Sequence, residues 1–138
     1  MPGDPGNIKY LLREPFERAV ESVRRALRNR GLQVEGQLDV SRRVERALGI
    51  AMPPCRIVFV LPNPSMAGAG SIHPWAAIFL PLHIVISDNA AQTEIQVQSR
   101  VQVGSEADEP ALFGPIMETQ VRVHEAIEAI AMRPSMVV

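Results

Sequence analysis

The sequence has little cysteine and no excess of either charge. Its single cysteine, Cys55, has no second cysteine in the chain with which to form a disulfide. The 14 basic and 15 acidic residues give a formal net charge of -1, so the surface as a whole provides no field that would attract phosphate backbones or anionic lipid. We therefore expect no nucleic acid and no membrane among the partners of this chain.

Long hydrophobic runs are also missing. The longest apolar segment, at residues 76–86, is much shorter than the ~20 residues of a membrane-spanning helix, and Pro81 and His83 interrupt it. Residues 1–7 have neither the basic region nor the apolar core of a secretory signal. These features predict a cytoplasmic protein.

The length of 138 residues suits one domain with a sizeable core. A chain of this size buries about two thirds of its unfolded surface, so we expect it to fold without a disulfide, a metal or another cofactor. We predict a single domain over residues 8–133, with flexible ends at residues 1–7 and 134–138.

Two segments have apolar residues at the spacing of an amphipathic helix. The first begins near Pro15, a residue favoured in a first helical turn, and ends at Gly31. The second covers residues 115–132. Its positions expected to face the core are Ile116, Gln120, Val123, Ile127 and Ile130.

A third, shorter helix is predicted near residues 42–48. Ser41 can cap its first turn, and Gly49 can end it. Its apolar residues expected to face the core are Val44, Ala47 and Leu48.

Other segments have the period-two alternation or the β-branched content of strands. They cover residues 8–13, 32–40, 56–61, 76–87 and 94–103. Gly36 is expected to bulge the second of them. Because consecutive strands are bracketed by helices, the pattern favours an α+β fold with a mostly antiparallel sheet and two main helices packed on one face.

Several ordered blocks of the sequence resemble the domain-of-unknown-function family numbered 302. In residues 54–67 a strand is followed by Asn63 and Pro64, and Ala67 stands three positions after that proline, as in the family. Residues 74–82 follow the spacing of the family's next signature. The shorter matching blocks are Leu38-Asp39-Val40 and Ala47-Leu48-Gly49.

This resemblance covers roughly residues 9–131 and implies a β-α-β(4)-α domain that is often a homodimer. It implies no reaction, because the family has no established activity. Pro62 and Leu82 stand where family members often have cysteines, and His83 stands where asparagine is common. Any metal or redox chemistry of those cysteines therefore does not carry over to this chain.

Three polar residues near these blocks are candidates for ligand binding. Asn63 could donate its amide to a ligand, although an asparagine between two prolines also suits a turn. His73 and His83 could bind a metal or move protons, but no cysteine or carboxylate stands near them, so we expect no metal site. His124 is expected to be solvated, and Cys55 to be a buried thiol and no nucleophile.

The sheet face away from the helices carries the main functional expectation. The residues of the 76–87 strand and its neighbour expected to face away are Phe79, Pro81, His83, Val85, Val58 and Val60. Polar residues expected at the rim of this surface are Gln96, Gln98 and Arg100. An apolar face with a polar rim indicates a partner surface or a ligand groove.

From these features we predict a non-enzymatic, homodimeric module that binds a small ligand or a protein. The ligand-binding residues of this hypothesis are Asn63, His73 and His83. The alternative is a small-molecule enzyme with a site near the 62–73 loop, in which His73 or His83 would act as acid or base. No motif in the sequence identifies a substrate.

Overall fold

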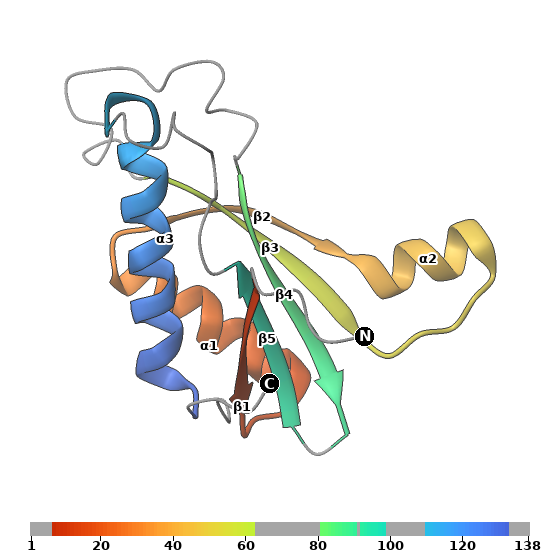
Figure 1. Cartoon of the computed structure of the whole chain (residues 1–138). Coiled ribbons are helices and arrows are strands. Elements are labelled where there is room, and N and C mark those ends of the chain that lie inside the picture. Colours follow the sequence, from red (N-terminus) through yellow and green to blue (C-terminus); the bar gives the residue numbers. More distant parts are fainter. Residues whose placement is uncertain (1–6, 63–80, 91, 99–109, 133–138) are drawn as a thin grey trace.

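The computed structural model describes residues 7–62, 81–90, 92–98 and 110–132. These residues form a five-stranded sheet in the order β1-β5-β4-β3-β2, with every neighbouring pair antiparallel. The strands are β1 (Asn7–Leu12), β2 (Gln33–Asp39), β3 (Cys55–Leu61), β4 (Leu82–Asn89) and β5 (Gln92–Gln98). The helices are α1 (Phe16–Asn29), α2 (Val40–Leu48) and α3 (Pro110–Ile130), as Figure 1 shows.

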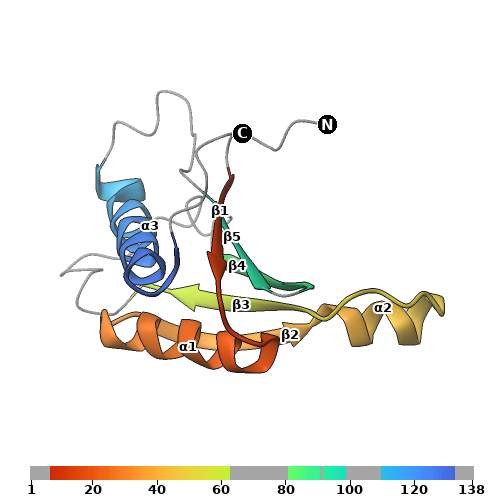
Figure 2. The ribbon, with the colours of Figure 1, turned by 90° about the horizontal axis from the view of Figure 1, so that it is seen from below.

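Two helices, α1 and α3, cover one face of the sheet, while α2 lies away from both (Figure 1, Figure 2). Fully buried aliphatic side chains fill the space between the layers, among them Leu27 on α1, Ile84 on β4 and Ile127 on α3. Burial of each such side chain stabilises the fold by roughly 1.5–3 kcal/mol relative to exposure. The predicted α+β class, with two main helices on one face of an antiparallel sheet, is confirmed.

The first main helix and the bulge of β2 agree with the prediction. The inward stripe of α1 is buried, including Val20, Val23 and Leu27. The chain leaves this helix through Gly31, whose φ of 75° lies in the left-handed region that favours glycine. The register of β2 against β3 shifts between Val34 and Gly36, which places the bulge where the glycine predicts it.

The short helix α2 differs from its prediction in its cap and in its surroundings. Asp39 caps it by accepting a hydrogen bond from the amide of Arg42 at 2.9 Å, and the predicted cap, Ser41, donates its hydroxyl to the same carboxylate at 2.8 Å. Gly49 ends the helix at a φ of 67°, as predicted. No residue of α2 is buried and Leu48 is 67% exposed, so the predicted inward packing is wrong. The helix extends beyond the sheet, where it meets no core (Figure 2).

The last helix begins earlier than predicted. It starts at Pro110, and Pro115, the predicted start, lies inside it. The hydroxyl of Thr119 donates to the carbonyl of Pro115 at 2.6 Å. The predicted inward stripe is buried at Ile116, Gln120, Val123 and Ile127. Among the described residues, no helix is both long and apolar enough to cross a bilayer.

The register of β3 corrects the predicted composition of the sheet face away from the helices. Val58 pairs with Ile84 and Val60 pairs with Leu82. All four side chains are buried beneath the helices, so the expectation that Val58 and Val60 face outward is wrong. The segment is apolar at both odd and even positions, and periodicity alone therefore could not choose its inward face.

The alternate residues of the same strands form what we call the outer face. Ile57 lies opposite Val85, Phe59 lies opposite His83, and Val85 lies opposite Gln96 on β5. The three apolar members are half-buried, and His83 is exposed. An apolar centre with a polar rim is thus present on this face. Phe79, Arg100 and the predicted strand residues 76–80 and 99–103 lie outside the described residues.

Candidate functional site

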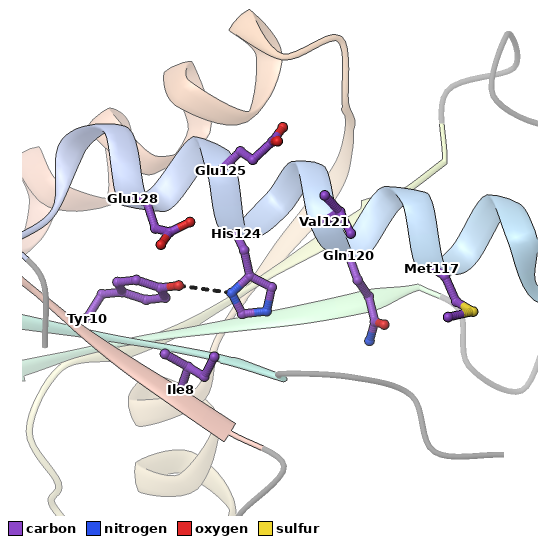
Figure 3. A pocket seen from close by; sticks show the side chains of 8 residues that line it. All are labelled: Ile8, Tyr10, Met117, Gln120, Val121, His124, Glu125 and Glu128. Atoms are coloured by element: carbon purple, nitrogen blue, oxygen red, sulfur yellow. Dashed lines mark hydrogen bonds between the residues drawn. The ribbon is translucent and has the colours of Figure 1, made fainter. Parts of the chain in front are cut away.

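A groove of about 470 Å³ lies between α3 and the edge strand β1 (Figure 3). Its volume falls in the range of roughly 300–1,000 Å³ that is usual for small-molecule sites. Its apolar lining residues are Ile8, Met117 and Val121. Its polar lining residues are Tyr10, Gln120, His124, Glu125 and Glu128.

Two periodicities bring these side chains together. Ile8 and Tyr10 share one face of β1 because alternate residues of a strand point the same way. On α3, Met117, Val121, His124 and Glu128 follow at intervals of three or four positions, which places them along one side of a helix. The two walls of the groove therefore come from the first strand and the last helix of the described chain.

His124 ties α3 to two strands of the sheet. The hydroxyl oxygen of Tyr10 lies 3.0 Å from Nδ1 of His124, and Nε2 lies 2.8 Å from the carbonyl oxygen of Gln98. Because a carbonyl only accepts, Nε2 carries a proton and donates it to the carbonyl of Gln98. Both ring nitrogens are engaged, so the expectation of a solvated His124 is wrong.

The lining of the groove is negatively charged. Glu125 and Glu128 line it, and no lysine or arginine of the described residues does. Glu125 lies 3.5 Å from Arg30 in an exposed ion pair, and water weakens such pairs strongly. Glu128 makes no ion pair with any residue that the structure describes.

A second polar cluster surrounds Arg56 at the base of α2. Its guanidinium donates to both carboxylate oxygens of Glu17, at 2.9 and 3.0 Å, and lies 3.6 Å from the carboxylate of Asp39. The hydrogen bond from Arg56 lowers the pKa of Glu17. The hydrogen bonds from the Arg42 amide and then from the Ser41 hydroxyl lower the pKa of Asp39. This cluster links α1 to the base of α2.

Cys55 begins β3 beside the same cluster and is buried. Its backbone amide donates to the hydroxyl of Ser41 at 3.3 Å. Burial, and to a smaller extent the charge of Asp39, raise the pKa of the thiol. A thiol with a raised pKa is a poor nucleophile at neutral pH, in agreement with the interpretation of Cys55 from the sequence.

Of the three predicted ligand-binding residues, the structure describes His83. Its ring stands edge-on to that of Phe59 on the outer face, with 5.4 Å between the ring centroids. Asn63 and His73 lie outside the described residues. Among the residues that are described, no group of three His, Cys, Asp or Glu side chains could hold a metal ion.

Sequence reasoning did not find Tyr10 and His124 as a pair. One signal was present, because His124 follows Gln120 by four positions and therefore extends the inward stripe of α3. A second was the position of Tyr10, which alternates with Ile8 and Leu12 on the inward side of the first strand. Neither signal says that the two stripes meet, because that depends on strand order in the folded sheet.

Exposed apolar side chains gather on α2 and on the segment that follows it. Leu48 is 67% exposed, Ile50 is 55% exposed and Met52 is 36% exposed. We call residues 40–54 the arm. Figure 1 shows that α2 projects from the sheet at the junction of β2 and β3. The arm therefore presents apolar surface that its own domain does not cover.

Comparison with known proteins identifies a family and a fold. Residues 8–130 match the model of a family described as domain of unknown function DUF302. The crystal structure of an uncharacterized conserved DUF302 protein from Bacillus stearothermophilus matches with a TM-score of 0.71 and 17% sequence identity, over 92% of this chain and 99% of that one. At this identity the likeness shows the fold alone. None of the curated proteins compared matches this chain.

Proposed function

This chain belongs to the DUF302 family, whose description assigns no activity, and from its own surfaces we propose that it is a non-enzymatic, homodimeric binding module. The observation that carries the proposal is the exposure of Leu48, Ile50 and Met52 on the arm. Single exposed apolar side chains are common on monomers, but a group of them on a projecting segment is typical of a partner surface.

A second copy of the chain would cover the arm and the outer face together. The arm leaves the sheet beside Leu38 of β2 and Ile57 of β3, which pair with each other, and Val85 follows on β4. The apolar part of the outer face therefore starts at the base of the arm. In a two-fold dimer each arm lies on the outer face of the other subunit, and every contact occurs twice. Each Å² of apolar surface removed from water contributes roughly 25 cal/mol.

The four titratable groups of the Arg56 cluster do not have the pKa shifts of an acid–base site. The pKa values of Glu17 and Asp39 are lowered, and those of Arg56 and Cys55 are raised. Each shift favours the form that the group already has at neutral pH, which is charged for the first three and neutral for the thiol. A general acid or base instead needs a pKa close to the working pH.

Ligand binding is the second part of the proposal. His83 stands on the outer face beside the ring of Phe59, where it offers a hydrogen-bonding group next to an aromatic surface. We retain His83, with Asn63 and His73, as proposed ligand-binding residues; of these, His83 lies on the outer face.

Substitution of Leu48 by glutamate tests the dimer. We expect light scattering to find a dimer for the wild-type protein at micromolar concentration and a monomer for Leu48→Glu, because the new carboxylate would lose its hydration inside an apolar contact. Val85→Glu should have the same effect, since the arm and the outer face belong to one interface. Circular dichroism should show that Leu48→Glu remains folded, because this side chain contributes nothing to the core.

Val121→Glu is the matched control. Val121 is 57% exposed, close to the exposure of Leu48, but it lies on α3, away from the arm and the outer face. This variant should remain dimeric. A wild-type protein that stays monomeric at high concentration would refute the dimer, and dimers of both Leu48→Glu and Val85→Glu would exclude this interface.

A further inference from the structure

We propose that the groove between α3 and β1 binds a small organic cation, whose ammonium or guanidinium group lies between Glu125 and Glu128 and whose apolar body covers Val121 and Met117. The inference rests on the ligand-binding part of the proposed function and does not require the dimer. Ile8 and Tyr10 reach the groove from the sheet face that carries the helices. The groove thus opens on the side opposite to the outer face and stays accessible in the proposed dimer.

The apolar part of the ligand follows from the exposure of Val121. Its side chain is 57% exposed although it lines a concave surface together with Met117 and Ile8 (Figure 3). An apolar molecule seated there would remove from water a valine that the fold itself leaves exposed. The volume of about 470 Å³ is that of a site for a small molecule.

The positive charge of the ligand follows from the charges of the lining. Glu125 and Glu128 contribute two carboxylates, and the ion pair with Arg30 at 3.5 Å compensates one of them in part. The Nε2–H group of His124 donates to the carbonyl of Gln98, so it is not offered to a ligand in the groove. Charge-assisted hydrogen bonds from a cation would satisfy the carboxylates, whereas an anion would be repelled.

The bonds of His124 also fix the shape of the groove wall. The ring is held at both nitrogens, by Tyr10 on β1 and by Gln98 on β5. Tyr10 is itself only 3% exposed and therefore packed in place. A ligand would meet a wall that is already ordered, and binding would cost little side-chain entropy there.

A pair of probes with the same apolar body and opposite charge tests the inference. The full-length protein, labelled with ¹⁵N, is titrated with 2-phenylethylamine and separately with 3-phenylpropionate. We expect saturable amide shifts in α3 and β1 with the amine, at a dissociation constant on the order of 1 mM. The carboxylate probe should bind at least about fivefold more weakly.

The double variant Glu125→Gln and Glu128→Gln tests whether these two carboxylates bind the ammonium group of the amine. It should weaken binding of the amine about fivefold or more, with little change in shape. Glu118→Gln is the control on the same helix, because Glu118 pairs with Arg122 at 3.1 Å and does not line the groove. This control should bind the amine as the wild type does.

Three results would overturn the inference. They are equal binding of the two probes, unchanged amine binding by the double variant, and the absence of saturable shifts in α3 and β1. Shifts centred on His83 instead would place the ligand on the outer face, as the proposed function has it, and would refute the groove. Light scattering of the same samples reports the dimer separately, so the two proposals can fail independently.

Discussion

Two helices of this chain have similar amphipathic sequences and opposite surroundings. Both carry arginine and glutamate on one side and aliphatic residues at intervals of three or four on the other. α1 buries Val23 and Leu27 completely, whereas no residue of α2 is buried and Leu48 is 67% exposed. An amphipathic pattern predicts that a helix has an apolar partner, but it does not say whether that partner belongs to the same molecule.

The connections explain why the two helices differ. Residues 13–15 separate β1 from α1, and this short loop lets the chain reverse and lay the helix on the sheet (Figure 1). β2 ends at Asp39 and α2 begins at Val40 without an intervening residue. Because no turn redirects the chain, α2 continues beyond the end of the sheet and cannot fold back over its face.

Truncation of one leucine in each helix measures this difference directly. We expect Leu27→Ala to lower the free energy of unfolding by about 2–5 kcal/mol, because it leaves a cavity between α1, the sheet and α3. Leu48→Ala in the monomer should change the same quantity by no more than about 0.5 kcal/mol. Urea unfolding followed by circular dichroism gives both values.

The dependence on protein concentration sharpens the test. If a second copy covers the arm, Leu48→Ala should cost more stability as the protein concentration rises, because unfolding of a dimer depends on concentration. The cost of Leu27→Ala should not change in this way. If Leu48→Ala and Leu27→Ala lowered the free energy of unfolding equally at low protein concentration, α2 would pack in a core.

Limited proteolysis with trypsin compares the helices by their local unfolding. Exposed arginines occur in both, at Arg25 and Arg28 in α1 and at Arg42, Arg43 and Arg46 in α2. Since opening of α2 exposes no core, we expect the monomeric Leu48→Glu variant to be cut in α2 at least about tenfold faster than in α1. Mass spectrometry of the first fragments identifies the sites.

The wild-type protein is the control for that experiment. Its arm should be cut more slowly than that of Leu48→Glu, because the proposed dimer covers it. Cleavage of α1 should occur at the same rate in both proteins. First cuts in α1, or an arm that is cut equally fast in both proteins, would contradict the assignment of the arm as an interface.

The fold was predictable where one local pattern decides the outcome. The inward stripe of α1, the bulge at Gly36 and the alternation of buried and less buried residues along β5 each follow from composition and period within a few residues. The inward face of β3 was not predictable, because its apolar residues occupy both parities and only pairing with β4 selects Val58 and Val60. Long-range register decides such cases.

The candidate site was less predictable than the fold. The groove needs Tyr10 and His124, which are 114 positions apart, to meet across β1 and α3. Each residue has an unremarkable local sequence, and neither forms a motif with its neighbours. The site residues that the sequence did suggest lie on the other side of the sheet, as His83 does, or outside the described residues, as Asn63 and His73 do.

The smallest expected effect concerns Arg56, where α1 meets the base of the arm. Its bond lowers the pKa of Glu17, so this carboxylate stabilises the fold above its unfolded pKa of about 4 and loses that contribution as the pH falls through its lower folded value. Glu17 is 74% exposed, and solvent screening limits the contribution to about 0.5 kcal/mol. Glu17→Gln should therefore be less stable than the wild type at pH 7, and this difference in stability should become smaller as the pH is lowered to 3.

Urea unfolding at both pH values, with Glu21→Gln as the control, checks this expectation. Glu21 is an exposed carboxylate one turn further along α1 that pairs with Arg24 at 3.6 Å and makes no bond to Arg56. A stability difference between the wild type and Glu17→Gln that is as large at pH 3 as at pH 7 would show that the Arg56 ion pair is not its cause. A difference that becomes smaller at pH 3, and also in high salt, would assign the effect to this ion pair, which joins α1 to β3 at the base of the arm.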